Sequence, residues 1–358
     1  MVQPATLAAK GRGIQAAVVT IGAPQWAEPM PLIHHDKPFS FGVAVLWGLL
    51  LSLPGHAQEV DPFRTRNLSP LASIFGVPSW DAATAPRSFA VTSELANHYR
   101  ASRRGTDVLI LDGETWRTNL SYQQAIGEAW FIGAELPYYR QSGGVLDDLV
   151  DAWHSFFSLP DGGRNARAEG ELLFQAADHS GIFLDLNQSR SAWGDMQLSI
   201  GHRMGADSRY IVEATVKLAT GDEDLLAGSG ATDWAISLFH PTEVNLRNRE
   251  AGYFWGLGLM RNGDPKGIRF EAESMTYYGI LGGTLKLLPR WGIKGQLDVH
   301  TAFFDTPLEE LGQTSVQIVL GGWWEMSRRG VLEFAVNEDL HVSTAPDVVL
   351  HIGLNWKW

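Results

Sequence analysis

The last twelve residues, Asp347–Trp358, read DVVLHIGLNWKW and decide the fold. Side chains of a β-strand point alternately to opposite faces. Every second residue from Val348 to Trp358 therefore shares one apolar face, and the residues between them, from Val349 to Lys357, share a mostly polar one. A transmembrane β-barrel strand needs this pattern, because its outer face meets lipid and its inner face lines a polar lumen. The alternation also fits an amphipathic strand over a soluble β-core, so the rest of the chain has to decide.

The composition excludes several classes of function. The formal net charge of -12 argues against a nucleic-acid partner, because phosphate binding needs a basic surface. The chain has no cysteine, which excludes a disulfide scaffold, thiolate metal sites, cysteine catalysis and a lipidated N-terminal cysteine. A mean hydropathy of -0.09 suits a β-barrel, whose apolar residues occupy alternate positions and form no long run. The 14 tryptophans favour a protein with apolar surfaces bordered by water.

One long apolar run, residues 41–53, is too short to span a bilayer as a helix but has the length of a signal-peptide core. Small residues follow at Gly55 and Ala57, where a signal peptidase reads the chain. We therefore expect residues 1–57 to be a leader and the mature chain to begin at Gln58; a buried core helix is the alternative. Residues 58–87 are interrupted by four prolines and show no clean period, which predicts either a periplasmic arm or a plug in the barrel mouth.

From residue 88 to the end, alternating segments recur and predict an all-β, antiparallel transmembrane barrel of about 12 strands, with 14 as the alternative count. An even number places both ends of the barrel on one side of the membrane. Connections alternate in length, as expected for short periplasmic turns and long outer loops. The short ones lie at 125–127, 205–208, 289–291 and 327–330, and the long ones at 141–192, 221–230, 262–267 and 305–313. The connection at 241–250, after a strand predicted over 234–240, is longer than this rule allows.

The longest connection, 141–192, is predicted to be an extracellular insertion. Its residues 145–157 carry apolar side chains at helical spacing, which indicates a helix that caps the barrel or acts as a lid or lipid-facing segment. His154 and Ser155 are adjacent there, but neighbours on a helix point about 100° apart and cannot form a catalytic pair. No GxSxG, HExxH or EF-hand motif occurs, so we expect no catalytic residues, no metal site and no cofactor.

Two further sets of residues follow from the strand register. Aromatic residues fall near both edges of the predicted membrane band and form two girdles, with Tyr99, Tyr138 and Phe303 also at the outer edge. The predicted membrane-interface residues are Trp130, Trp193, Trp234, Trp291, Trp324, Trp356 and Trp358. The predicted lumen-lining residues are Glu94, Arg117, Glu135, Arg203, Glu213, Lys217, Lys294, Asp298, His300 and His351. Their mixed signs indicate ion-pair networks in a narrow lumen, without the single-sign ring of an ion-selective filter.

Several stretches also resemble a known family. They are Leu111–Arg117, Glu135–Gly144, Trp153–Arg164 (WHSFFSLPDGGR, the most specific), Leu297–Asp305 and Glu338–Asp347. They are similar to the bacterial domain-of-unknown-function family 3187 of Gram-negative envelopes, from about Asn67 to the end. The terminal Trp358 departs from the phenylalanine commonest at the end of such barrels. The resemblance implies an outer-membrane-like barrel and brings no activity.

The sequence thus predicts an integral barrel of the cell outer membrane, either a narrow passive channel or a structural barrel of unknown solute. An outer-membrane lipid-modifying enzyme and a soluble periplasmic β-protein are the alternatives. Expected partners are outer-membrane lipid, lipopolysaccharide and, through the C-terminal strand, the barrel-assembly machinery, with no nucleic acid.

Overall fold

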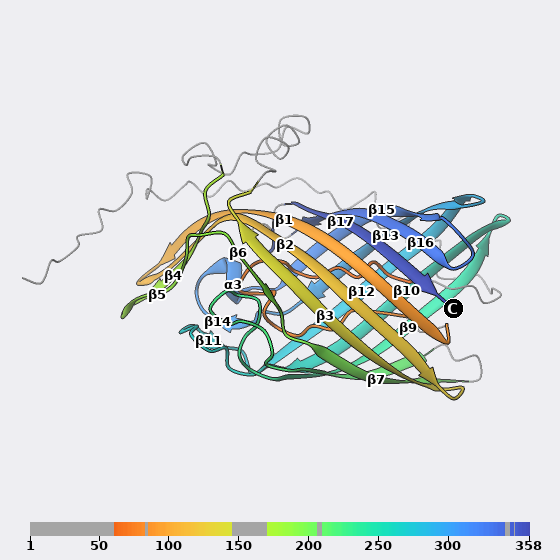
Figure 1. The fold of residues 1–358 in the computed structure, drawn as a ribbon, viewed down its shortest axis with the longest axis horizontal. Helices are drawn as coiled ribbons and strands as arrows, with labels where there is room; N and C mark the ends of the chain where they lie inside the picture. Colours follow the sequence, from red (N-terminus) through yellow and green to blue (C-terminus); the bar gives the residue numbers. More distant parts are fainter. Residues whose placement is uncertain (1–60, 83–84, 145–169, 206–209, 341–343, 347) are drawn as a thin grey trace, which may run out of the picture. The chain divides into compact units, whose positions relative to one another are not determined.

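The computed structural model describes residues 61–82, 85–144, 170–205, 210–340, 344–346 and 348–358, which form a closed antiparallel β-barrel (Figure 1). Twelve strands make the wall, as the sequence predicts. In order around the barrel they are β1 (Arg87–Arg104), β2 (Asp107–Ile126), β3 (Trp130–Ser142), β7 (Gln197–Met204), β8 (Tyr210–Lys217), β9 (Asp233–Leu246), β10 (Arg249–Arg261), β12 (Met275–Leu288), β13 (Trp291–His300), β15 (Ser315–Glu325), β16 (Gly330–Asp339) and β17 (Val348–Lys357). The last strand closes the ring by pairing with the first, from Ser88↔Lys357 to Asn97↔Val348.

The two ends of the barrel differ. We call the end with the β2–β3, β9–β10, β12–β13 and β15–β16 connections the turn end, and the opposite one the loop end. Both ends of the wall's chain meet at the turn end, where the amide of Arg87 donates to the carbonyl oxygen of Trp358 at 3.0 Å. In the described part of the chain, no helix is long and apolar enough to span a membrane.

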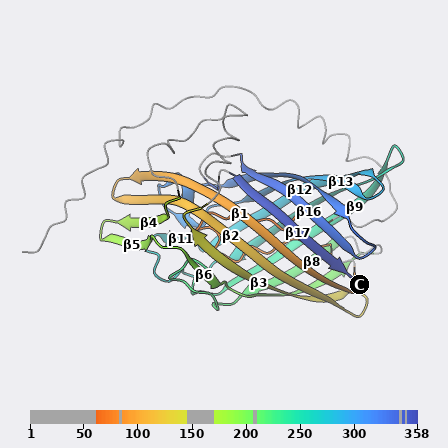
Figure 2. The ribbon, with the colours of Figure 1, turned by 45° about the horizontal axis from the view of Figure 1, so that its top comes forward.

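The smaller elements lie at the loop end. They are β4 (Leu173–Asp178), β5 (Gly181–Leu186), β6 (Arg190–Trp193), β11 (Glu271–Ala272), β14 (Phe304–Asp305) and the short helix α3 (Glu309–Gly312). The β4–β5 hairpin extends the sheet beside β1 and β2, because β4 pairs with Val108–Asp112 of β2 (Figure 2). The predicted insertion 141–192 therefore contains strands in its described part. The predicted helix at 145–157 and the leader 1–57 lie outside the described residues.

The long connection predicted at 241–250 is wrong. Strand β9 continues to Leu246, and only Arg247 and Asn248 connect it to β10, with φ of 51° and 66°. Two central residues with positive φ form the hairpin turn whose twist matches that of paired strands. Pro241 does not end the strand, because the pairing of β9 with β8 stops at Phe239 and a proline is tolerated past that point.

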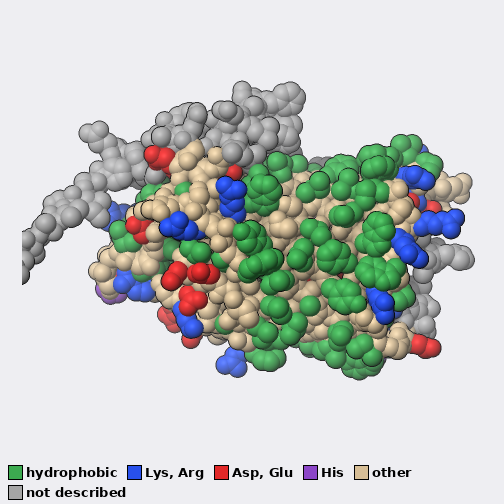
Figure 3. All heavy atoms as spheres, viewed as in Figure 1, with side chains coloured by type: hydrophobic (Ala, Val, Ile, Leu, Met, Phe, Trp, Pro, Cys, Tyr) green, Lys and Arg blue, Asp and Glu red, His purple; other side chains and the backbone are tan. Residues whose placement is uncertain are grey.

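The predicted alternation appears as two faces of the wall. On β17, Ile352, Leu354 and Trp356 are exposed, whereas His351 and Asn355 are buried inside. Figure 3 shows hydrophobic side chains spread over the strands of one face, with charged side chains mostly toward its two ends. Six of the seven predicted interface tryptophans are exposed at the outer surface, and Trp324 is half-buried because it stacks on Trp291, with 5.6 Å between the ring centroids.

The placement of Phe303 in an outer girdle is wrong. Strand β13 ends at His300, so its alternation does not extend to Phe303. The Phe303 ring turns inward and stacks on Phe75, with 4.6 Å between the centroids.

Candidate functional site

The lumen of the barrel holds the candidate site, and residues 61–82 lie in it. We call these residues the inner segment. It begins at the turn end, where Asp61 forms an ion pair with Lys357 at the end of β17. It reaches the loop end at residues 74–76 and returns, so that Arg64 on the first limb forms an ion pair with Asp81 on the second. These residues belong to the stretch 58–87, for which the sequence predicts either a periplasmic arm or a plug.

The first limb follows β13 in a fixed register. The backbone amide of Phe63 donates to Oε1 of Gln296 at 2.8 Å, and the Thr65 hydroxyl donates to Oδ2 of Asp298 at 2.7 Å. The Asn67 amide lies 3.0 Å from Nε2 of His300. Each pair is separated by 233 residues in sequence. Alternate residues of the limb thus face alternate inward residues of the strand, as side chains with a period of two require.

An ion-pair network joins the middle of the inner segment to β1, β2 and β3. Nη1 of Arg117 donates to Oε2 of Glu94 at 2.7 Å, and its Nη2 lies 4.0 Å from Oε2 of Glu135. Arg66 reaches the same Glu135 oxygen at 3.8 Å, and the Ser79 hydroxyl donates to it at 3.2 Å. Burial lowers the pKa of the Arg66 guanidinium, and the neighbouring Arg117 cation lowers it further. Glu135 therefore has to balance two crowded cations, one from the wall and one from the segment.

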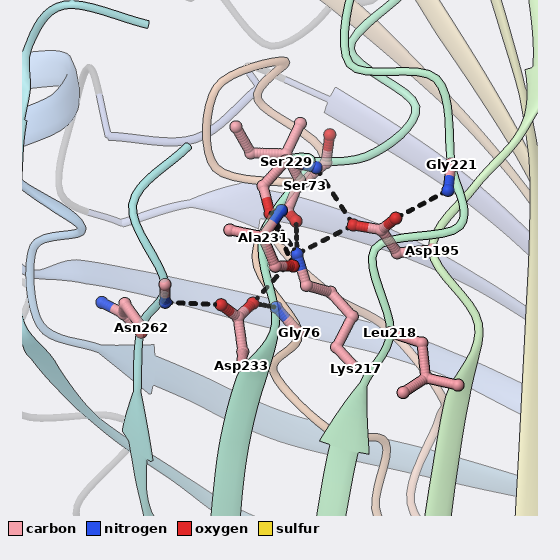
Figure 4. Close-up of polar contacts among 12 residues, drawn as sticks. Ser73, Gly76, Asp195, Lys217, Leu218, Gly221, Ser229, Ala231, Asp233 and Asn262 are labelled. Carbon is pink, nitrogen blue, oxygen red and sulfur yellow. Dashed lines mark hydrogen bonds and ion pairs between the residues drawn. The ribbon is translucent and has the colours of Figure 1, made fainter. Parts of the chain in front are cut away.

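Lys217 and its two carboxylate partners, Asp195 and Asp233, hold the tip of the inner segment at the loop end, and we call these three residues the Lys217 clasp (Figure 4). Nζ of Lys217 lies 2.8 Å from Asp195 and 3.1 Å from Asp233, and it donates to the carbonyl oxygen of Ile74 at 2.9 Å. The amide of Gly76 donates to Asp233 at 2.8 Å. A Cβ at Gly76 would lie 2.6 Å from Cβ of Lys217, so only glycine allows this close approach.

A second buried lysine lies on β13. Nζ of Lys294 is 2.5 Å from Oε1 of Glu333 and 4.4 Å from the centroid of the Phe63 ring. Asn355 donates to the other Glu333 oxygen at 2.6 Å. The Phe63 ring also meets the edge of His351, with 5.7 Å between the centroids. The first limb is thus bound by hydrogen bonds, charge and aromatic contact together.

The remaining surfaces of the inner segment are apolar. At the loop end, Leu71, Ile74 and Phe75 pack in one buried cluster with side chains of the loops and of β2 and β4. On the side of β3, β8, β9, β10 and β12, Trp80 and Ala82 pack against a cluster of inward side chains. That cluster contains Phe131, Ile211, Phe239, Phe254 and Ile280.

All ten predicted lumen-lining residues point to the inside of the barrel. The networks above contain Glu94, Arg117, Glu135, Lys217, Lys294, Asp298, His300 and His351, whereas Arg203 and Glu213 lie half-buried on β7 and β8. Asp195 and Asp233 were not among the predicted site residues. Asp195 lies within the strand predicted over 193–204, but only residues from Met196 onward were assigned to its two faces, and Asp233 immediately precedes the strand predicted over 234–240. No group of three or more potential metal ligands occurs in the described part of the chain.

One protein family and several solved outer-membrane proteins are similar to this chain. The model of a family described as "Protein of unknown function (DUF3187)" matches residues 47–358. The COG4313 outer membrane channel of Pseudomonas putida F1 is 12% identical, with 84% of this chain and 100% of that chain covered and a TM-score of 0.46. The NanC porin is 8% identical, with coverage of 75% and 100% and a TM-score of 0.43. The toluene transporter TodX of P. putida is 8% identical, with coverage of 77% and 91% and a TM-score of 0.39. No curated protein matches the chain.

Proposed function

The chain belongs to the DUF3187 family of proteins of unknown function, and we propose that it is an outer-membrane barrel forming a narrow passive channel that the inner segment closes. The outer surface supports the membrane location. Leu257 on β10 and Leu320 on β15, in mid-strand positions, are 64% and 56% exposed, as residues facing lipid would be. A water-soluble barrel would leave this apolar surface in water.

One observation carries the channel proposal: buried polar and charged side chains of the wall contact the inner segment, beside its apolar packing. Buried ion pairs contribute little net stability, and apolar side chains of similar volume would fill a purely structural barrel at least as well. Here Glu135, Lys217 and Asp298 all contact the segment. A wall that keeps both signs of charge facing the lumen is suited to hydrated solutes once the segment moves.

Planar-bilayer conductance tests the proposal. The full-length protein should conduct weakly, whereas a variant lacking residues 61–82 should show discrete conductance steps, because the wall charges then face water. A heat-modifiability gel serves as the folding control, since a folded barrel migrates anomalously in detergent until it is boiled. A folded deletion variant without conductance would refute the channel and favour a structural barrel.

Further parts of the proposal concern export and environment. We infer that residues 1–57 are a leader cleaved before Gln58, which N-terminal sequencing of the exported protein checks. The exposed tryptophans would contact lipid and lipopolysaccharide at the interfaces, and β17 would be recognised by the barrel-assembly machinery. The insertion 141–192 would then be extracellular, because the loop end faces outward when the C-terminus is periplasmic.

A further inference from the structure

A small cavity lies inside the barrel, between the inner segment and the wall. Its volume is about 40 Å³, which is enough for about three water molecules. The first limb contributes Thr65 and Asn67 to its lining, the tip contributes Phe75, and the second limb contributes Trp80. Inward residues of β12, β13 and β15, together with Phe303 after β13, complete the lining. The inner segment and the wall therefore build the cavity together.

Strand pairing places four polar side chains next to one another on the wall side of the cavity. Asp298 on β13 lies directly opposite Gln317 on β15, and His300 lies directly opposite Tyr278 on β12. All four line the cavity. The buried Nε2 of Gln317 has no hydrogen-bond partner among the described residues. Nearly all buried polar groups bond to protein or to ordered water, so this free N–H group indicates that the cavity holds water.

The carboxylate of Asp298 lies in the cavity without an opposite charge. It accepts hydrogen bonds from the hydroxyl of Thr65 at 2.7 Å and from the amide of Gln296 at 3.1 Å. These donors are neutral, and Asp298 has no ion-pair partner among the described residues. The lumen carboxylate of Glu333, by contrast, has Lys294 as its cation. A buried carboxylate that no cation balances either binds one or takes up a proton.

Two basic side chains also line the cavity, and neither balances this carboxylate. The amide nitrogen of Asn67 lies 3.0 Å from Nε2 of His300, and Nδ1 of the same ring lies 2.9 Å from the carbonyl oxygen of Thr301. An amide nitrogen only donates and a carbonyl oxygen only accepts, so His300 is neutral and carries its proton on Nδ1. Arg66 instead pairs with Glu135 at 3.8 Å.

Aromatic rings form much of the remaining lining. Trp80 lies against Tyr278, with 5.5 Å between the ring centroids, and Phe75 stacks on Phe303 at 4.6 Å. Aromatic rings attract a cation that lies within about 6 Å of the ring centroid. A cavity with aromatic sides and one unbalanced carboxylate is therefore suited to a small organic cation.

We propose that this cavity binds a small ammonium cation. Its N–H groups donate to Asp298, and its alkyl part contacts the rings of Trp80, Tyr278 and Phe303. The inference deepens the proposed channel by naming a class of solute, and it rests on that channel only for passage of the cation through the barrel. Binding itself requires only the full-length protein with the inner segment in place.

The test is binding of ethylammonium to the folded full-length protein in detergent, titrated by saturation-transfer NMR. Ethanol is the control ligand, because it has the same number of non-hydrogen atoms and no charge. Asp298→Asn removes the charge and keeps a similar shape. Glu213→Gln is the matched control variant, since Glu213 on β8 is also an inward carboxylate without an ion-pair partner among the described residues but does not line the cavity. Heat modifiability checks folding.

We expect ethylammonium to bind with a Kd in the millimolar range, because three non-hydrogen atoms allow at best about 1 mM. Ethanol should bind at least about tenfold more weakly, and Asp298→Asn should weaken ethylammonium by at least about tenfold, since both remove the charge interaction. Glu213→Gln should change the Kd by less than about twofold, because its charge lies outside the cavity. Trp80→Leu should weaken binding about threefold through loss of one ring.

Three results would overturn the site. They are no saturable binding of ethylammonium up to about 0.1 M, equal affinity for ethanol, and equal losses in Asp298→Asn and Glu213→Gln. If Asp298→Asn does not fold, the comparison of ethylammonium with ethanol on the parent protein decides the question.

Conductance of the variant lacking residues 61–82 separates this inference from the proposed function. If that variant conducts and the full-length protein does not bind ethylammonium, the cation site is wrong and the channel stands. If the full-length protein binds ethylammonium through Asp298 and the deletion variant is folded but silent, the cation site stands and the channel is wrong.

Discussion

Removing the charge of Lys217 should loosen the inner segment and destabilise the barrel. The Lys217 side chain is 2% exposed, and its partners Asp195 and Asp233 are 4% and 1% exposed. Lys217→Met keeps the aliphatic stem but leaves two carboxylates buried without their cation, and it removes the hydrogen bond to the carbonyl oxygen of Ile74. Removing one partner of a buried ion pair costs about 3–5 kcal/mol, because the remaining charge stays desolvated.

Lys286 offers a matched control, since it also bridges two carboxylates. Its Nζ lies 2.8 Å from Glu250 and 2.9 Å from Glu325, but these side chains are 47% and 34% exposed. Water can solvate them once the lysine is gone, so Lys286→Met should cost at most about 1 kcal/mol. Guanidinium unfolding of protein refolded in lipid vesicles, followed by tryptophan fluorescence, measures both. Equal losses, or a loss under about 1 kcal/mol for Lys217→Met, would show that burial of the clasp contributes no more than an exposed ion pair.

Three further outcomes are expected. Leu257→Arg, in the middle of β10, should destabilise the barrel in vesicles by about 2–4 kcal/mol, whereas Leu288→Arg at the turn end should cost about 0–1 kcal/mol, and equal costs would argue against a lipid-facing surface. An epitope inserted between His179 and Ser180, in the exposed β4–β5 turn, should bind antibody on intact cells, and one inserted between Pro289 and Arg290 should not; the reverse would invert the topology. In the variant lacking residues 61–82, Glu213→Gln with Asp298→Asn removes two lumen carboxylates, so reversal potentials should shift toward anions, and unchanged selectivity would show that these residues do not line the path.

The wall could be predicted from the sequence because apolar and polar residues alternate along each strand, so each strand's own sequence shows which residues face lipid and which face the lumen. Residues such as Ile352 and His351 differ in character at every step, and the strand number follows from counting such segments. The end of β9 could not be placed, because Pro241 is a strong strand breaker only where its missing amide is needed by a neighbouring strand. The prediction for Phe303 was wrong for a related reason. Odd or even position gives the direction of a side chain only within a strand, and β13 ends before Phe303.

The inner segment could not be predicted in the same way. Its residues have no period, because Phe63, Thr65 and Asn67 are matched to side chains of β13 and not to a repeating surface. The two partners of each contact are 233 residues apart, so neither stretch of sequence shows a local pattern from which the contact could be predicted. Only part of the Lys217 clasp could be predicted. Lys217 follows the alternation of β8 and was predicted to face the lumen, whereas Asp195 lies in the irregular residues before β7 and was not predicted as its partner.

The return of the inner segment to its starting end has a mechanical consequence. Both limbs leave the lumen at the turn end, where the amide of Ala82 donates to Asp61 at 3.2 Å, so the segment can be drawn out as a loop without threading a chain end through the barrel. Tension applied from that side acts along β13. It loads the pairs at Phe63, Thr65 and Asn67 in shear, all at the same time, and does not peel them apart in sequence.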